Sequence, residues 1–130
     1  MNGALLDTSV VIAAADGDVL LPDDAAISVV TLGELHAGVL RARRATEREQ
    51  RSTRLRLIRS AFVSIPVDGD VAEQYGRALA LAREEGRGTD AADLLIIATA
   101  AAIGDALHTR DAGQAKLARR LGLVVHGPDE

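Results

Sequence analysis

The sequence predicts an α/β fold, a three-layer α/β/α sandwich in which a central parallel sheet lies between two layers of helices. Short runs of leucine or β-branched residues alternate along the chain with longer segments of helical periodicity. Strands that alternate with helices are joined by right-handed crossovers, so the sheet is parallel and both of its faces are covered. The chain has 130 residues, 48% of them hydrophobic, and we expect residues 1–130 to form one domain.

The first half of the chain is expected to contain three strands and three helices. Apolar residues at positions 32, 35, 39 and 40 have the helical period, and Thr46 offers a cap for the charged helix that follows. Pro66 cannot donate a ladder hydrogen bond, which places its strand at an edge of the sheet. The expected strands are Ala4–Leu6, Ala26–Ser28 and Val63–Val67, and the expected helices are Thr8–Ala15, Val30–Ala45 and Thr46–Ser60.

The second half of the chain continues the same alternation. Gly86-Arg87-Gly88 ends a helix that begins at Val71, and the next helix begins at Thr89 or Asp90. That next helix is apolar almost all round, so we expect it to be the central buried one. The remaining expected elements are a strand at Ala106–Thr109, a helix at Gly113–Arg120 and a last strand at Leu123–Val125.

Residues that are absent or scarce exclude several classes of protein. The chain has no cysteine, which excludes a disulfide framework and thiol catalysis and indicates a cytoplasmic protein. Its longest apolar stretch, Leu94–Ile103, is too short to cross a membrane, and its N-terminus lacks the basic lead of a secretory signal. The three histidines, which have no metal-binding spacing and so disfavour zinc, are His36, His108 and His126.

Charge is distributed unevenly along the chain. The net charge is −4, yet the segment Arg41–Arg59 contains eight arginines and two glutamates, a local balance of +6. So many arginines in one segment favour contact with RNA or a protein partner, because the guanidinium group suits phosphate and carboxylate. A solvated helical face is the alternative, since arginine far outnumbers lysine in the whole chain.

Four acidic residues are predicted to meet at one edge of the sheet. Asp7 directly follows the first strand, and Asp111 follows the Ala106–Thr109 strand after one arginine. Glu34 and Asp93 are expected in the first turns of two helices. Because crossovers bring helix N-termini and strand carboxyl ends to the same edge, the four side chains should converge where such folds place their chemistry.

Helix capping is the simpler interpretation of each acid taken alone. Thr31 and Glu34 have the spacing of a capping box, and Asp90 and Asp93 have that of a variant of it. Asp7 and Asp111 would likewise cap the helices after them. This interpretation is weakest at Asp93, which lies three and four residues before isoleucines of the buried stripe, where an unpaired carboxylate is costly.

Electrostatics decides how such a cluster would be tolerated. Two like charges about 4 Å apart repel by about 4 kcal/mol at an effective dielectric constant of 20. Four such acids require protonation or a divalent cation, and all-oxygen ligands suit Mg²⁺ or Mn²⁺. Such a site beside a basic segment suggests hydrolysis of phosphodiester bonds, with hydroxyls of Thr8, Ser9 and Thr109 orienting water or a carboxylate.

Four stretches of the chain, in order, resemble the PIN-domain ribonucleases, and among them the VapC toxins of bacterial toxin–antitoxin pairs. The resemblance implies a PIN fold and a Mg²⁺- or Mn²⁺-dependent endoribonuclease that hydrolyses tRNA or rRNA and inhibits translation. It also implies a homodimer that is neutralised by a cognate VapB-type antitoxin. The stretches are LLDTSVVIAA at 5–14, SVVTLGELHAG at 28–38, DLLIIATA at 93–100 and HTRD at 108–111.

The resemblance assigns roles to the acids. Asp7, Asp93 and Asp111 match the metal ligands, and Glu34 matches the residue that holds or activates water. Thr8 matches the hydroxyl after the first acid, while Asp90 and Thr109 are accessory candidates. A further acid common in the family is missing at 112–114, where Ala-Gly-Gln stands, and its absence disfavours tight binding of two ions.

Three other classes of protein share parts of this pattern. A phosphoacceptor receiver domain, with Asp68 as acceptor, would require a second acid at Thr8 and a lysine at His126. Phosphotransfer of the haloacid-dehalogenase type would require an aspartate where Ser9 stands. A catalytically silent PIN-fold module that binds RNA or protein stays open, although four intact acids are unsuited to an anion-binding surface.

Overall fold

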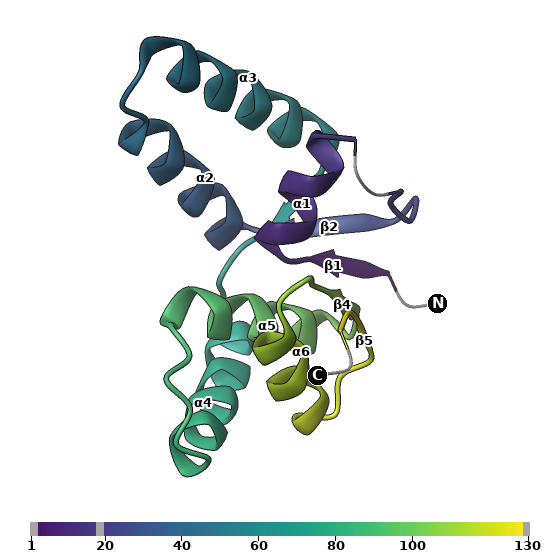
Figure 1. Ribbon diagram of the computed structural model, residues 1–130. Coiled ribbons are helices and arrows are strands. Elements are labelled where there is room, and N and C mark those ends of the chain that lie inside the picture. The colour runs from purple at the N-terminus through teal and green to yellow at the C-terminus, as the bar shows by residue number, and fades with distance from the viewer. Residues whose placement is uncertain (1–2, 18–19, 129–130) are drawn as a thin grey trace.

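A computed structural model of the chain describes residues 3–17 and 20–128. Within these ranges the predicted fold is confirmed, because five parallel strands form one sheet in the order β3-β2-β1-β4-β5 and six helices pack around it (Figure 1). The strands are β1 Ala4–Leu6, β2 Ala25–Ser28, β3 Val63–Ile65, β4 Ala106–His108 and β5 Val125–His126. The helices are α1 Thr8–Ala15, α2 Val29–Arg41, α3 Ala45–Ala61, α4 Gly69–Glu84, α5 Ala91–Ile103 and α6 Ala112–Arg120.

The central strand β1 divides the core into two layers. Leu5 points to one face of the sheet and packs with α4, α5 and α6, whereas Ala4 and Leu6 point to the other face and pack with α1, α2 and α3. Figure 1 shows these two groups of helices on opposite sides of the strands. Both leucines are fully buried, which stabilises the fold by about 1.5–3 kcal/mol for each side chain.

Helix α5 is the most buried helix, as predicted. Its first residue follows Asp90, and six of its thirteen residues are buried. Gly104 ends it in the left-handed region, at φ 74°, which only glycine adopts without strain. The helix therefore holds the residues of its first turn rigidly at the carboxyl edge of the sheet.

The pairing of β1 with β4 brings the distant ends of the chain together at the site. Leu6 is in register with His108, and the backbone N–H of Asp7 donates to the carbonyl oxygen of His108 at 2.8 Å. The residues that follow these two strands, Asp7 and Thr109, therefore begin side by side. No helix in the described ranges has the length and apolar character needed to cross a bilayer.

Several element boundaries differ from the prediction. The strand predicted at Leu123–Val125 is β5 at Val125–His126, because the N–H of Leu123 still donates to Ala118 in the turn that ends α6. Thr46 is not the cap of α3; the helix begins one residue earlier, after Arg44, and has no side-chain cap. The strand β3 lies at the edge, as predicted, and ends before Pro66.

Candidate active site

Asp7 is a buried carboxylate held by hydroxyl groups. Its side chain is 4% exposed, and one carboxylate oxygen accepts hydrogen bonds from Ser9 Oγ at 2.7 Å and Thr109 Oγ1 at 2.9 Å. Although Asp7 occupies the N-cap position of α1, its side chain makes no capping hydrogen bond. The capping interpretation is therefore wrong for Asp7, whose carboxylate is turned toward the end of β4 instead.

Gln114, whose role no local sequence pattern predicts, completes the surroundings of Asp7. It is 2% exposed, and its amide nitrogen faces Thr109 Oγ1 at 2.7 Å and Asp7 Oδ2 at 3.0 Å. This orientation is favoured because Thr109 has one hydroxyl hydrogen, which it donates to Asp7, and must accept from the amide. In the opposite orientation the amide oxygen would accept from Thr109 at 2.7 Å but would face the Asp7 carboxylate, and the amide nitrogen would make a 3.4 Å contact with the carbonyl oxygen of Asp93.

Glu34 is linked to α1 through two threonines. Thr8 Oγ1 donates to Glu34 Oε1 at 2.5 Å and lies 3.0 Å from Thr31 Oγ1, which is fully buried. The predicted capping box of Thr31 and Glu34 is wrong, because α2 begins at Val29 and the cap is Ser28, whose Oγ accepts from the N–H of Val30. Glu34 consequently lies in the second turn of α2, where its carboxylate is free of the backbone.

Asp90 and Asp111 do cap helices, as the simpler interpretation predicted. Asp90 Oδ1 accepts from the N–H of Asp93 at 2.9 Å, and Asp111 Oδ1 accepts from the N–H of Gln114 at 3.0 Å. Each bond occupies one carboxylate oxygen with a local amide. The second oxygen of Asp111 is free to face a ligand, so capping and ligand binding are compatible there.

Asp93 lies where the charges of the other acids meet. Partial burial is the largest cause of its altered pKa, followed by the negative charges of Asp90, Asp7, Glu34 and Asp111. Together they raise the pKa of Asp93 from 3.8 to about 6. The acids that precede α1, α5 and α6, together with Glu34 of α2, therefore lie close enough to Asp93 to repel it. This is the convergence that the sequence predicted.

Among the described residues, the four acids have no cationic partner. In the part of the chain that the structure describes, the ion pairs involve other residues, and none includes Asp7, Glu34, Asp93 or Asp111. No three acidic or histidine side chains there are already drawn close enough to enclose an ion. Oxygen-only donors of uncompensated charge fit a divalent cation in chemistry, and neutralisation by such an ion would draw the repelling carboxylates together.

A shallow hollow opens beside these acids. It has a volume of about 390 Å³ and is bounded on one side by the loop between α4 and α5 and on the other by the start of α6. Acidic residues and one arginine line this hollow. The lining consists of Arg87, Gly88, Thr89, Asp90, Asp93, Asp111, Gly113 and Gln114.

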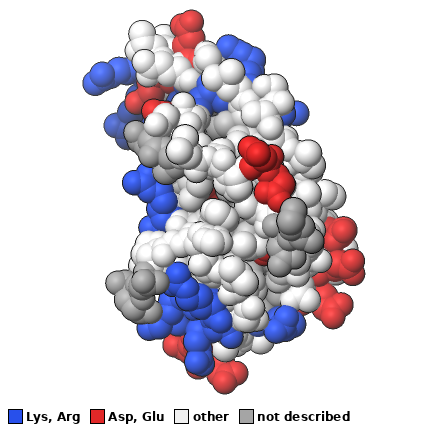
Figure 2. All heavy atoms as spheres, turned by 90° about the vertical axis from the view of Figure 1, so that its right-hand side faces the viewer, with Lys and Arg blue, Asp and Glu red and all other residues white. Residues whose placement is uncertain are grey.

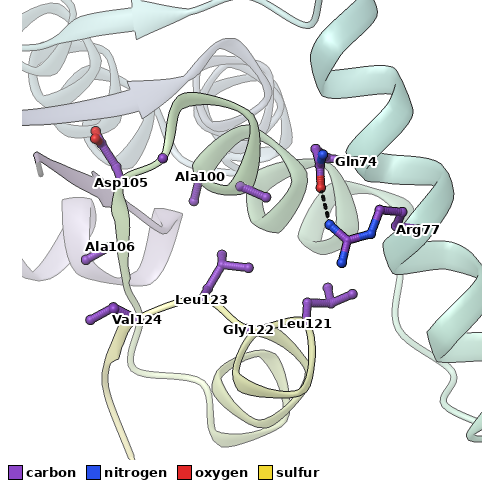
Figure 3. Close-up of a pocket in the computed structure, with 11 residues that line it drawn as sticks. Gln74, Arg77, Ala100, Asp105, Ala106, Leu121, Gly122, Leu123 and Val124 are labelled. Carbon is purple, nitrogen blue, oxygen red and sulfur yellow. Dashed lines mark hydrogen bonds between the residues drawn. The ribbon is translucent and has the colours of Figure 1, made fainter.

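A second cavity, of about 290 Å³, lies at the opposite edge of the sheet. Figure 3 shows it between Gln74 and Arg77 of α4 and the turn that contains Leu121 and Leu123. Gln74 and Arg77 are hydrogen-bonded to each other at 2.7 Å. None of the four predicted acids lines this cavity, so the chemistry expected of them belongs to the carboxyl edge.

The arginine segment has a partly structural role. Arg51 donates to the carbonyl oxygen of Gly38 at 2.6 Å, and Arg48 donates to that of Ala42 at 3.1 Å, so both fasten α3 to the end of α2. Arg59 contacts His36 at 3.2 Å in the same hairpin. On the face in Figure 2, basic side chains gather near this hairpin at the upper end and also at the lower end of the molecule.

The fold and the acidic edge define a known class of domain. Residues 4–120 match the PIN domain model, so the chain belongs to the PIN-domain family. Ribonucleases of this family generally use divalent metal ions. The match includes Asp7, Glu34, Asp93 and Asp111 within its span.

Within this family the chain is similar to two ribonucleases from Mycobacterium tuberculosis. It is 39% identical to ribonuclease VapC5 over 111 residues, which cover 82% of each chain. It is 42% identical to ribonuclease VapC8 over 100 residues, which cover 74% of this chain and 88% of the relative. These similarities agree with the resemblance inferred from the four sequence stretches.

Solved structures of similar proteins have the same fold. The crystal structure of VapBC-5, a toxin–antitoxin system from Mycobacterium tuberculosis, contains a chain that is 36% identical, with a TM-score of 0.80 and 98% of each chain covered. FitAcB from Neisseria gonorrhoeae has a TM-score of 0.71 at 28% identity, covering 94% of this chain and 95% of that one. The chain therefore spans nearly the full length of these relatives.

Proposed function

We propose that this protein is a metal-dependent endoribonuclease toxin that hydrolyses phosphodiester bonds of tRNA or rRNA and thereby inhibits translation. The observation that carries the proposal is a set of four acids at the carboxyl edge of a PIN fold that have no cationic partner in residues 3–17 and 20–128. The names of the ribonuclease relatives support the same activity. Residues 1–130 would act as one domain.

Asp7, Asp93 and Asp111 would hold Mg²⁺ or Mn²⁺. The ion would supply Lewis-acid activation of water and would offset negative charge on the phosphate. Asp7 would be held in a fixed orientation by Ser9, Thr109 and Gln114, whose hydrogen bonds restrict its rotation. Asp90 would keep α5 capped and so keep the first turn, with Asp93, in place.

Glu34 would orient the attacking water and accept its proton. Thr8 donates to Oε1 of Glu34, which leaves the second carboxylate oxygen as the acceptor. The fully buried Thr31 fixes Thr8 in turn, so a side chain from α1 and one from α2 together set the position of this base. Thr8 and Thr109 would thus be positioning residues, each for one carboxylate.

A VapB-type antitoxin and a second copy of this chain are the proposed protein partners. The solved relatives include VapBC toxin–antitoxin systems, which supports the antitoxin. A homodimer is the assembly that the family resemblance implies. Exposed arginines just before α3, such as Arg43 and Arg44, would be available for RNA or antitoxin.

RNA cleavage with and without Mg²⁺ tests the proposal. Wild-type protein should cleave structured RNA only with the metal ion, and Asp7→Asn and Asp93→Asn should lose cleavage while retaining their circular dichroism spectra. Asp16→Asn is the matched control, because this exposed acid lies at the far end of α1 and should leave cleavage unchanged. Equal cleavage by all four proteins, or cleavage in excess chelator, would refute the catalytic assignment.

The catalytically silent PIN-fold module remains the second candidate. It predicts that wild-type protein binds RNA or a partner protein but leaves RNA intact at every Mg²⁺ or Mn²⁺ concentration. The same assay therefore separates the two functions, provided that binding is followed in parallel by fluorescence anisotropy.

A further inference from the structure

Arg87 is held in a fixed position at the edge of the acidic hollow. It follows Gly86, which ends α4 with φ 68°, and its backbone N–H donates to the carbonyl oxygen of Ala82 at 2.8 Å. Its Nε donates to Glu85 Oε1 at 2.7 Å. Both ends of the residue are therefore anchored, so little conformational entropy remains to be lost when its guanidinium group binds a ligand.

The charge of Arg87 is not cancelled by Glu85. Arg120 of α6 also binds this carboxylate, with its Nε 2.9 Å from Oε2 and its Nη2 at 2.9 Å as well. One carboxylate is thus paired with two guanidinium groups. The trio of Glu85, Arg87 and Arg120 therefore has a net charge of +1. In the described part of the chain, the two Nη groups of Arg87 have no hydrogen-bond acceptor.

The positive charge of Arg87 lies beside the negative charges of the acidic residues that line the hollow. Among the described residues that line the hollow, Arg87 is the one cation, and it shares the lining with Asp93 and Asp111. A nucleic acid entering the hollow would carry its own negative charge toward these acids. The fixed guanidinium group of Arg87, at the edge of the hollow, would offset that repulsion. Its two parallel N–H donors would also match the oxygens of a phosphate.

We propose that Arg87 binds a phosphate of single-stranded RNA next to the bond that is cleaved, and that Glu85 and Arg120 hold it in position for this contact. The inference rests on the proposed nuclease function and adds to it a substrate-binding residue outside the acidic set. Arg87 would set the affinity and register of the RNA strand, whereas the carboxylates would carry out the hydrolysis.

A purely structural role for Arg87 is the alternative, because its ion pair with Glu85 belongs to the contact that links the end of α4 to Arg120 of α6. The two roles differ in their salt dependence. A lost phosphate contact reduces the slope of log affinity against log salt by about 0.7 for a single strand, whereas a loosened loop leaves that slope unchanged.

The test compares Arg87→Gln with wild type on a short single-stranded RNA, across a series of KCl concentrations with Mg²⁺. We expect KM to rise about tenfold, kcat to stay within about twofold, and the salt slope to fall by about 0.7. Arg77→Gln is the matched control, because this exposed arginine of α4 lines the cavity at the opposite edge and should change neither quantity. Unchanged KM and salt slope in folded Arg87→Gln would overturn the proposal.

A second variant tests the role of the trio. Arg120→Gln leaves Glu85 to neutralise Arg87 alone, so it should raise KM by a smaller factor, about threefold. The same substitution should have no effect in the Arg87→Gln background, because the two act through one contact. An equal effect in both backgrounds would show that Arg120 acts independently and would refute the holding role.

Binding measurements separate this proposal from the nuclease proposal. Anisotropy of a labelled RNA without metal reports affinity alone. If wild type binds RNA more tightly than Arg87→Gln but cleaves nothing with Mg²⁺, the nuclease proposal fails and the role of Arg87 stands. If wild type cleaves RNA and Arg87→Gln binds it equally well, only the role of Arg87 fails. Absence of RNA binding by wild type would overturn both.

Discussion

Replacement of Asp93 by Asn should stabilise the metal-free protein above pH 6. The folded-state pKa of Asp93 is raised to about 6, so its protonated form is the one that suits the fold. The stability linked to this group is fully present below about pH 4 and is lost as the pH rises through 6. An ionised Asp93 therefore opposes folding at pH 7.5 unless a cation neutralises the site.

The size of this effect follows from the pKa. A rise from 3.8 to about 6 corresponds to about 3 kcal/mol, since one pKa unit is worth about 1.4 kcal/mol. Asp93 is only partly buried, and solvent screening reduces the effect to about 1–2 kcal/mol. The Asn side chain has nearly the same shape, and the backbone N–H of residue 93 still donates its capping hydrogen bond to Asp90.

Urea denaturation in EDTA between pH 4 and 8 measures the effect. The free energy of unfolding of Asp93→Asn should equal that of wild type at pH 4 and exceed it by about 1–2 kcal/mol at pH 7.5. Mg²⁺ at pH 7.5 should then stabilise wild type and have little effect on the variant. A constant loss of stability by Asp93→Asn at every pH would refute this reasoning, because it would mean that Asp93 is stabilised by local hydrogen bonds.

Three further substitutions test the surrounding network. Thr109→Val keeps the shape but removes the hydroxyl that binds Asp7 and Gln114, so it should cost about 1–3 kcal/mol in urea denaturation; a smaller loss would contradict the network. Asp111→Asn should keep its cap on α6 and its melting temperature but weaken Mn²⁺ binding at least about tenfold in calorimetry. Gly127→Ala should lower stability by about 1–3 kcal/mol in thermal denaturation, because its Cβ would lie 2.6 Å from the Thr109 carbonyl oxygen.

The order of elements was predictable because it depends on local patterns. Apolar periodicity, the turn at Gly86 and the proline at position 66 each act within a few residues, and they correctly predicted alternating strands and helices and an edge strand at β3. The buried character of α5 followed from its composition in the same way. Once the sheet was parallel, topology alone brought Asp7 and Asp111 to the same edge.

The hydrogen bonds at the site were less predictable because they connect distant residues. Thr31 has the local spacing of a capping residue, yet its hydroxyl contacts Thr8 on another helix, 23 residues away. Gln114 resembles any polar residue in the first turn of a helix, and only the folded chain, which brings the start of α6 next to Asp7, gives it this acceptor. A buried amide among carboxylates has no signature in a single sequence.

Direct measurement of Mn²⁺ binding tests the central claim that carboxylates gathered at the end of the sheet form a cation site. Isothermal titration calorimetry at pH 7.5 would compare wild type with Asp7→Asn, with Asp16→Asn as the control. Wild type and the control should bind Mn²⁺ equally, with Mg²⁺ competing, and Asp7→Asn should bind at least about tenfold more weakly. Equal binding by all three proteins would contradict the claim.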